Sequence, residues 1–148
     1  RPTSEKEVHR QIYLRREDAG MIIHAHTKKA MAVSVRKIRE VPCLVEEMSQ
    51  LIGGGIPITP QYVPAEQHFQ LGTTAAENIG NRNGVILRNH GPVAVGRNPE
   101  EAVLMVEVIE KACEIFLDQG QMFYAPIPQC YIDSERYRYL YKYGNETT

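Results

Sequence analysis

The sequence predicts one mixed α/β domain, in which short apolar strands alternate with helices. Two apolar segments, 84–88 and 92–96, are separated only by residues 89–91, which predicts two strands joined by a tight connection. An Asn cap, a proline and apolar residues at three- and four-residue spacing predict a long helix from residue 98 to Gly120. The length of 148 residues fits one such domain.

The first half of the chain carries signals for the other elements. Ser4 and Glu7 have the spacing of a capping box, which predicts a helix that has Ser4 as its N-cap and runs to about Arg16. The apolar residues 21–23 predict a short strand, and Thr27 is expected to cap a second helix. Further elements are expected as a strand at 41–44, a helical segment at 46–51, a strand at 56–58 and a helix at 73–81. The tyrosine-rich end is expected to be a polar tail.

The composition argues against several classes of protein. Hydrophobic residues make up 43% and charged residues 24% of the chain, which is typical of a globular protein rather than a disordered one. The net charge of −1 argues against a basic surface for nucleic acid. The longest apolar run, 102–106, is far shorter than the roughly 20 residues that span a bilayer, and no signal peptide is apparent. The three cysteines are widely separated, which favours a reducing, cytoplasmic location.

Three of the five histidines stand at the ends of predicted strands. His24 and His26 end an apolar segment, and side chains two residues apart on a strand point to one face. His90 lies in the turn between the two later strands. Three imidazoles without a cysteine nearby match a catalytic metal site better than a structural one, although a His-x-His pair alone is also typical of structural histidines. His9 and His68 are expected to be packing or surface residues.

Several segments of the chain resemble the class II aldolase/adducin family. These segments are Arg1-Pro2-Thr3-Ser4-Glu5 with His9, Asp18-Ala19 with Ile22-Ile23-His24-Ala25-His26, Gly53-Gly54, Leu87-x-Asn89-His90-Gly91 with Ala94 and Gly96, and Glu101-Ala102. They follow the order of the family and extend over almost the whole chain, and the L-fuculose-1-phosphate aldolases are the most similar members. The resemblance implies a central, mostly antiparallel β-sheet flanked by helices in one domain that spans residues 1–148.

The resemblance also implies a metal site. The residues that match the family's zinc ligands are Glu5, His24, His26 and His90. Glu5 also matches the catalytic base, although its place in the first helical turn is explained equally by the helix dipole. Thr3 and Ser4 match a hydroxyl pair that binds the substrate phosphate, and a helix N-terminus suits an anion. Tyr143 matches a tyrosine that enters the site of a neighbouring subunit, but a tyrosine-rich tail also fits interface packing. The same ligands accept Co²⁺, Mn²⁺ or Fe²⁺ as well as Zn²⁺.

The implied activity is the zinc-dependent cleavage of a phosphorylated sugar. A ketose 1-phosphate of the L-fuculose 1-phosphate type would give dihydroxyacetone phosphate and a hydroxyaldehyde through a metal-stabilised enediolate, in a homotetramer with sites between subunits. The alternatives are a pentulose-phosphate 4-epimerase, which would carry Asp in place of Glu5, and another metal-dependent lyase of the family. A binding module of the adducin kind and an inactive scaffold with an intact metal site are further alternatives.

The sequence departs from the family pattern in two places. Nothing matches the family's earlier phosphate-binding segment, and the chain begins at Arg1 rather than at methionine, so we expect residues 1–148 to lack an N-terminal segment. Glu46 and Glu47 stand where the aldolases have a tyrosine before the Gly-Gly segment. The second departure leaves the identity of the sugar phosphate open.

Overall fold

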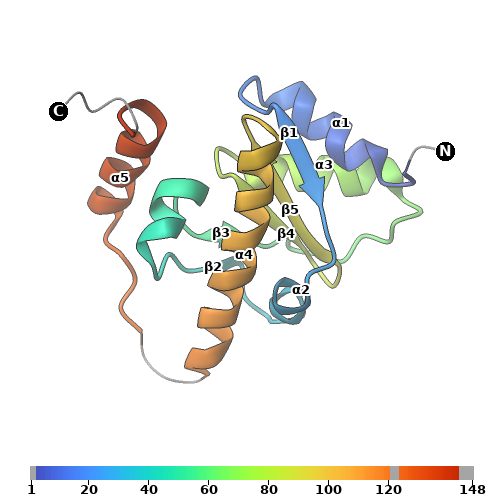
Figure 1. Ribbon diagram of the computed structural model, residues 1–148. Coiled ribbons are helices and arrows are strands. Elements are labelled where there is room, and N and C mark those ends of the chain that lie inside the picture. Colours follow the sequence, from blue (N-terminus) through green and yellow to red (C-terminus); the bar gives the residue numbers. More distant parts are fainter. Residues whose placement is uncertain (1–2, 121–123, 144–148) are drawn as a thin grey trace.

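A three-stranded sheet stands between two groups of helices in the computed structural model, which describes residues 3–120 and 124–143 (Figure 1). The strands lie in the order β1 (Met21–His24), β5 (Gly91–Gly96) and β4 (Gly84–Leu87). The central strand β5 pairs antiparallel with both neighbours. The predicted mixed α/β fold, with a central antiparallel sheet flanked by helices, is therefore confirmed.

Helices cover both faces of this sheet. On one face α1 (Lys6–Arg15) packs against α3 (His68–Ile79), and on the other lie α4 (Pro99–Gln119) and α2 (Lys28–Ser34) (Figure 1). Successive side chains of a strand point to opposite faces, so β4 and β5 contribute to two core clusters. The residues of β4 and β5 in the cluster of α1 and α3 are Val85, Leu87, Val93 and Val95, and those in the cluster of α2 and α4 are Ile86 and Ala94.

The remaining elements form a second group around a small sheet. They are β2 (Glu40–Val41), the π-helix η1 (Met48–Ile52), β3 (Ile56–Pro57) and α5 (Gln129–Tyr141). β2 pairs antiparallel with β3, and an isolated parallel bridge between Ile58 and Ile86 joins this unit to the central sheet. α5 packs against η1 at the side of the molecule away from α1 (Figure 1).

The start of α1 differs from the prediction. Its N-cap is Glu5 and not Ser4, and no side chain makes the expected capping hydrogen bond. The hydroxyl oxygen of Thr3 instead accepts the N–H of Glu5 at 3.2 Å. The carboxylate of Glu7 accepts a hydrogen bond from the side chain of Gln11, one turn further along, so it does not complete a capping box. The predicted helix exists, but it begins one residue later.

Other predictions were also wrong in extent or type, among them the cap expected from Thr27, whose side chain makes no capping hydrogen bond at the start of α2. The strand expected at 41–44 ends at Val41 because Pro42 has no N–H to extend the ladder. α3 begins at His68 rather than at residue 73. The expected polar tail contains the helix α5, of which only Ile132 is buried, so the sequence carries almost no apolar periodicity there.

The predicted long helix is confirmed in its start and its end. The side chain of Asn98 accepts the N–H of Glu101 at 2.8 Å, Pro99 occupies the first turn, and Gly120 follows the last residue. No helix in the described part of the chain combines the length and the hydropathy that crossing a bilayer requires.

Candidate metal centre

The sheet register brings His24 and His90 to the same edge. His24 is the last residue of β1 and lies opposite Val93, near the start of β5. His90 lies in the turn that joins β4 to β5, where Leu87 is opposite Gly91. The end of β1 and this turn therefore meet beside the first residues of β5.

The turn that carries His90 is held by its own backbone. Asn89 has a φ of 56°, in the left-handed region that Asn tolerates better than most residues. The N–H of His90 donates to the carbonyl of Leu87 at 3.0 Å, and the N–H of Asn89 donates to the carbonyl of Ser34 at 3.2 Å. These bonds fix the backbone of the turn from which the imidazole of His90 projects.

The other two candidate ligands come from the segment after β1 and from the start of α1. His26 lies beyond the end of β1, so the prediction that both members of the His-x-His pair stand on one strand was wrong. The backbone of Ala25 stays close to β5, since its N–H donates to the carbonyl of Pro92 at 3.1 Å. Glu5 lies at the N-terminus of α1, with carboxylate oxygens 2.9 Å from Nε2 of His24 and 3.2 Å from Nε2 of His90.

The three imidazoles converge on a common point. Their Nε2 atoms are 3.2 Å apart between His24 and His26, 3.4 Å between His24 and His90, and 3.0 Å between His26 and His90. The ligand atoms of these residues and of Glu5 all lie within 4.8 Å of one another. A tetrahedral ion with bonds of about 2.0–2.1 Å requires nitrogen separations of about 3.3 Å. The geometry therefore fits a divalent cation.

The tautomer of His24 supports this conclusion. Its Nδ1 lies 2.9 Å from the carbonyl oxygen of Pro92, which can only accept a hydrogen bond. Nδ1 therefore carries the proton of the neutral ring, and Nε2 directs a lone pair towards the other histidines. A hydrogen bond from the second ring nitrogen to a backbone carbonyl is a usual way in which a protein orients a metal-ligating histidine.

Burial keeps two of the histidines neutral. The side chains of His24 and His90 are only 8% and 13% exposed, and that of Glu5 is 14% exposed. Burial lowers the pKa of both His24 and His90, and it outweighs the nearby carboxylate of Glu5, which acts in the opposite direction. Neutral imidazole is the form that binds a metal. His26 is exposed, which leaves one side of the cluster open to solvent.

The other residues singled out in the sequence lie outside this cluster. His9 is partly buried on α1 and His68 is exposed at the start of α3, and neither belongs to the group that could hold a metal. Thr3 and Ser4 are exposed just before α1. Tyr143 is exposed just after α5, the helix that lies on the side of the molecule away from α1 (Figure 1), and its ring lies near that of Tyr139.

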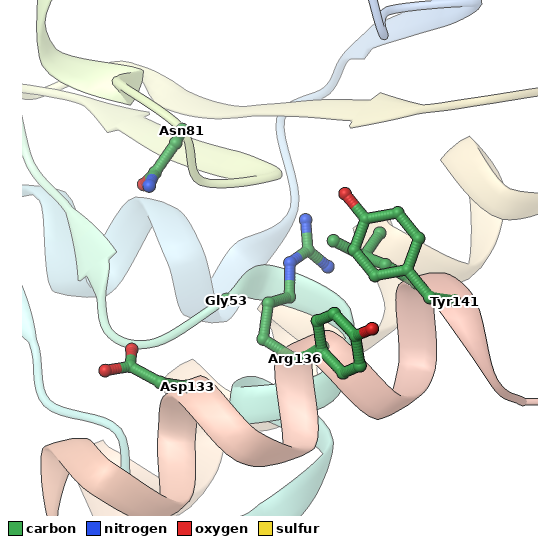
Figure 2. A pocket seen from close by; sticks show the side chains of 7 residues that line it. Gly53, Asn81, Asp133, Arg136 and Tyr141 are labelled. Carbon is green, nitrogen blue, oxygen red and sulfur yellow. The ribbon is translucent and has the colours of Figure 1, made fainter.

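A hollow of about 240 Å³ beside α5 is a separate feature (Figure 2). Its lining includes Gly53, Asp133 and Arg136 but none of the four candidate ligands. The guanidinium of Arg136 donates to the carbonyls of Gln50 and Leu51 at 2.8 Å each, at the end of η1. These contacts give Arg136 a structural role, since they attach α5 to the rest of the fold.

Comparison with known proteins identifies the family. The model of the class II aldolase and adducin N-terminal domain matches residues 1–117. The chain belongs to the class II aldolase and adducin family. Within this family it is similar to the L-fuculose phosphate aldolase of Escherichia coli strain K12, with 28% identity over 116 residues. That match covers 78% of this chain and 53% of the relative, so the chain spans about half the length of the curated relatives it matches.

Solved structures of the family share the fold. An L-fuculose 1-phosphate aldolase has a TM-score of 0.87 at 25% identity, over 95% of this chain and 65% of the other. The l-fuculose-1-phosphate aldolase of Thermus thermophilus has a TM-score of 0.63 at 29% identity, over 85% of this chain and 66% of the other. The predicted resemblance to the L-fuculose-1-phosphate aldolases is confirmed by both kinds of comparison.

Proposed function

We propose that the protein is a zinc-dependent class II aldolase. Its substrate would be a ketose 1-phosphate of the L-fuculose 1-phosphate type, and its products dihydroxyacetone phosphate and a hydroxyaldehyde. The observation that carries the proposal is the convergence of three imidazoles and one carboxylate within 4.8 Å in a chain of this family. A divalent cation bound there supplies positive charge that stabilises the oxygen anion formed when the carbon–carbon bond breaks.

Glu5 is proposed as the group that transfers a proton. Its carboxylate lies beside the Nε2 atoms of His24 and His90, in a largely buried position. Cleavage of the bond between C3 and C4 leaves an electron pair that must be protonated at C3, and a carboxyl group beside the metal centre is placed to do this. Tyr143 of a neighbouring subunit is proposed to relay the proton that leaves the C4 hydroxyl of the departing aldehyde. Its phenol accepts this proton while it releases its own hydroxyl proton to solvent, so one proton leaves O4 for each proton that reaches C3.

The start of α1 is proposed as the binding place for the substrate phosphate. Thr3 and Ser4 present exposed hydroxyl groups there, and the first N–H groups of a helix attract an anion. Because Glu5 is the N-cap of the same helix, a phosphate at this end would lie next to the metal centre. The remainder of the proposal is a cytoplasmic homotetramer with active sites between subunits. The role of Tyr143 requires only that a neighbouring subunit reach each site.

An assay for dihydroxyacetone phosphate tests the activity. The zinc-loaded protein is mixed with L-fuculose 1-phosphate, and the product is measured through a coupled reductase. Release of dihydroxyacetone phosphate is expected, whereas conversion of a pentulose 5-phosphate to its C4 epimer without this product would point to an epimerase. Zinc content far below one equivalent after purification and reloading would contradict the metal centre itself.

A pair of variants tests the role of Glu5. Glu5→Gln keeps the size of the side chain but can neither take up nor deliver a proton, so at saturating zinc we expect turnover to fall by about 10²–10⁴-fold. Glu7→Gln is the control, because Glu7 lies in the first turn of the same helix but accepts its hydrogen bonds from Arg10 and Gln11. Turnover of Glu5→Gln equal to that of the control would show that Glu5 is not the base.

A further inference from the structure

A carboxylate from a distant helix caps the N-terminus of α2. The two oxygens of Glu110, on α4, accept the backbone N–H groups of Lys29 at 2.7 Å and Ala30 at 3.2 Å. These N–H groups are at the second and third positions of α2, which an N-cap side chain normally satisfies. The residue at the N-cap is Thr27, whose buried hydroxyl has no hydrogen-bond partner in the described part of the chain. Glu110 therefore performs the capping that Thr27 does not.

This cap stands next to the least supported ligand of the metal centre. His26 immediately precedes the N-cap of α2, and it is the exposed member of the cluster. Among the described residues, its ring nitrogens are within hydrogen-bonding distance only of His24 and His90. His24 differs in this respect, since its second ring nitrogen is held by the carbonyl of Pro92. The position of the His26 ring thus depends on its own backbone.

The backbone around His26 is fixed on both sides. On one side the N–H of Ala25 donates to the carbonyl of Pro92 at 3.1 Å. On the other side begins α2, a helix of seven residues. So short a helix is marginal in isolation, and its first turn depends on contacts with other elements. A carboxylate at this end forms charge-assisted hydrogen bonds and also interacts favourably with the helix dipole.

We infer that Glu110 is a positioning residue for the metal centre. By capping α2 it holds the backbone on the C-terminal side of His26, so that Nε2 of His26 stays within reach of the point shared with His24 and His90. This inference rests on the proposed function, because it assigns Glu110 to the same site. Metal–ligand distances tolerate changes of only about 0.2 Å, so a small movement of this segment affects binding.

The test compares two carboxylates one turn apart on α4. Glu110→Ala removes the cap, whereas Glu114→Ala is the control. Glu114 also reaches α2, but its oxygen lies 3.8 Å from the side-chain Nζ of Lys29, and within the described residues it caps no backbone group. Zinc affinity is measured by competition with a chromophoric chelator, and the ligand geometry by the visible spectrum of the Co²⁺-loaded protein. Amide hydrogen exchange at Lys29 and Ala30 reports the state of the cap.

We expect Glu110→Ala to bind zinc about 10- to 100-fold more weakly, as is usual when the outer support of a ligand is removed. Its Co²⁺ spectrum should change and both amides should exchange faster, while the control keeps the wild-type values. Adding Thr27→Asn, which supplies a good N-cap in place of Thr27, should restore part of the affinity. If Glu110→Ala does not fold, Glu110→Gln gives the same comparison with the side-chain volume retained.

Two results would overturn the inference in different ways. If both amides lose protection but zinc affinity and the Co²⁺ spectrum stay at wild-type values, Glu110 caps α2 without positioning His26, and the proposed function is untouched. If the wild-type protein itself does not bind zinc or Co²⁺, the proposed metal centre fails and the inference fails with it.

Discussion

Gly91 occupies a crowded backbone position beside the candidate metal centre. A Cβ atom at this position would lie 2.5 Å from the carbonyl oxygen of Ala25 and 3.4 Å from Cδ2 of His26. Carbon–oxygen contacts normally begin at about 3.3 Å, so Gly91→Ala requires a separation of about 0.8 Å between β5 and the segment that follows β1. His26 follows Ala25 on one side of this contact, and His90 precedes Gly91 on the other side. Separating the two segments therefore moves His26 away from His90.

A shift of this size is large for a metal ligand. Because ligand distances tolerate about 0.2 Å, we expect the zinc affinity of Gly91→Ala to fall by at least about 10- to 100-fold. Overpacking of this kind should also lower the free energy of unfolding by about 1–3 kcal/mol. Zinc affinity is measured by chelator competition, and stability by denaturant unfolding of the metal-free protein.

Gly96→Ala is the matched control. Gly96 is at the other end of β5, and a Cβ there would lie 2.4 Å from the backbone nitrogen of Ala102, so the steric overlap is similar but distant from the site. We expect a comparable loss of stability with unchanged zinc affinity. If Gly91→Ala binds zinc as tightly as Gly96→Ala does, the close approach at Gly91 does not determine the geometry of the ligands.

Two further predictions concern residues outside the metal centre. Burial raises the pKa of Cys43 to about 11 and that of Cys113 to about 12, whereas Cys130 is exposed. A thiol reagent should therefore modify only Cys130 rapidly in the native protein, and all three cysteines after unfolding. Burial opposes ionisation of Glu101, but the hydrogen bonds from Arg97 outweigh it and the pKa of Glu101 is lowered. Glu101→Gln should therefore lower the free energy of unfolding by about 1.5–3 kcal/mol at neutral pH. The difference between variant and wild type should disappear as the pH falls below about 4 and passes through the lowered pKa of Glu101, because the carboxylate is then protonated. Denaturant unfolding at several pH values measures this difference.

The sequence predicts where the candidate metal ligands lie, because short elements determine their places. The apolar segment before His90 is buried along its whole length, and the one before His24 ends directly at the first ligand, so both are recognised as strands. The tight turn between β4 and β5 leaves little freedom for His90. Glu5 could be assigned only through the family resemblance, because a carboxylate in a first helical turn has an ordinary explanation of its own.

What the sequence does not predict depends on contacts between distant residues. Nothing local indicates that Glu110, in the middle of a long helix, caps a helix some 80 residues earlier. No local pattern indicates the helix α5 either, because it buries only Ile132 and is held by polar contacts such as those from Arg136 to Gln50 and Leu51. The N-cap of α1 is Glu5 rather than the predicted Ser4, and the hydroxyl of Thr3 accepts the backbone N–H of Glu5.

The positions of the candidate metal ligands have a consequence for how the protein would unfold with an ion bound. Glu5 belongs to the helix on one side of the sheet, and His26 leads into the helix on the other side, so a bound ion would act as a cross-link through the whole thickness of the molecule. No partly unfolded form that has released either helix retains the complete coordination shell. Thermodynamic linkage then raises the free energy of releasing α1 and that of releasing α2 by the same amount, about 2.7 kcal/mol when the free metal is at 100 times its dissociation constant.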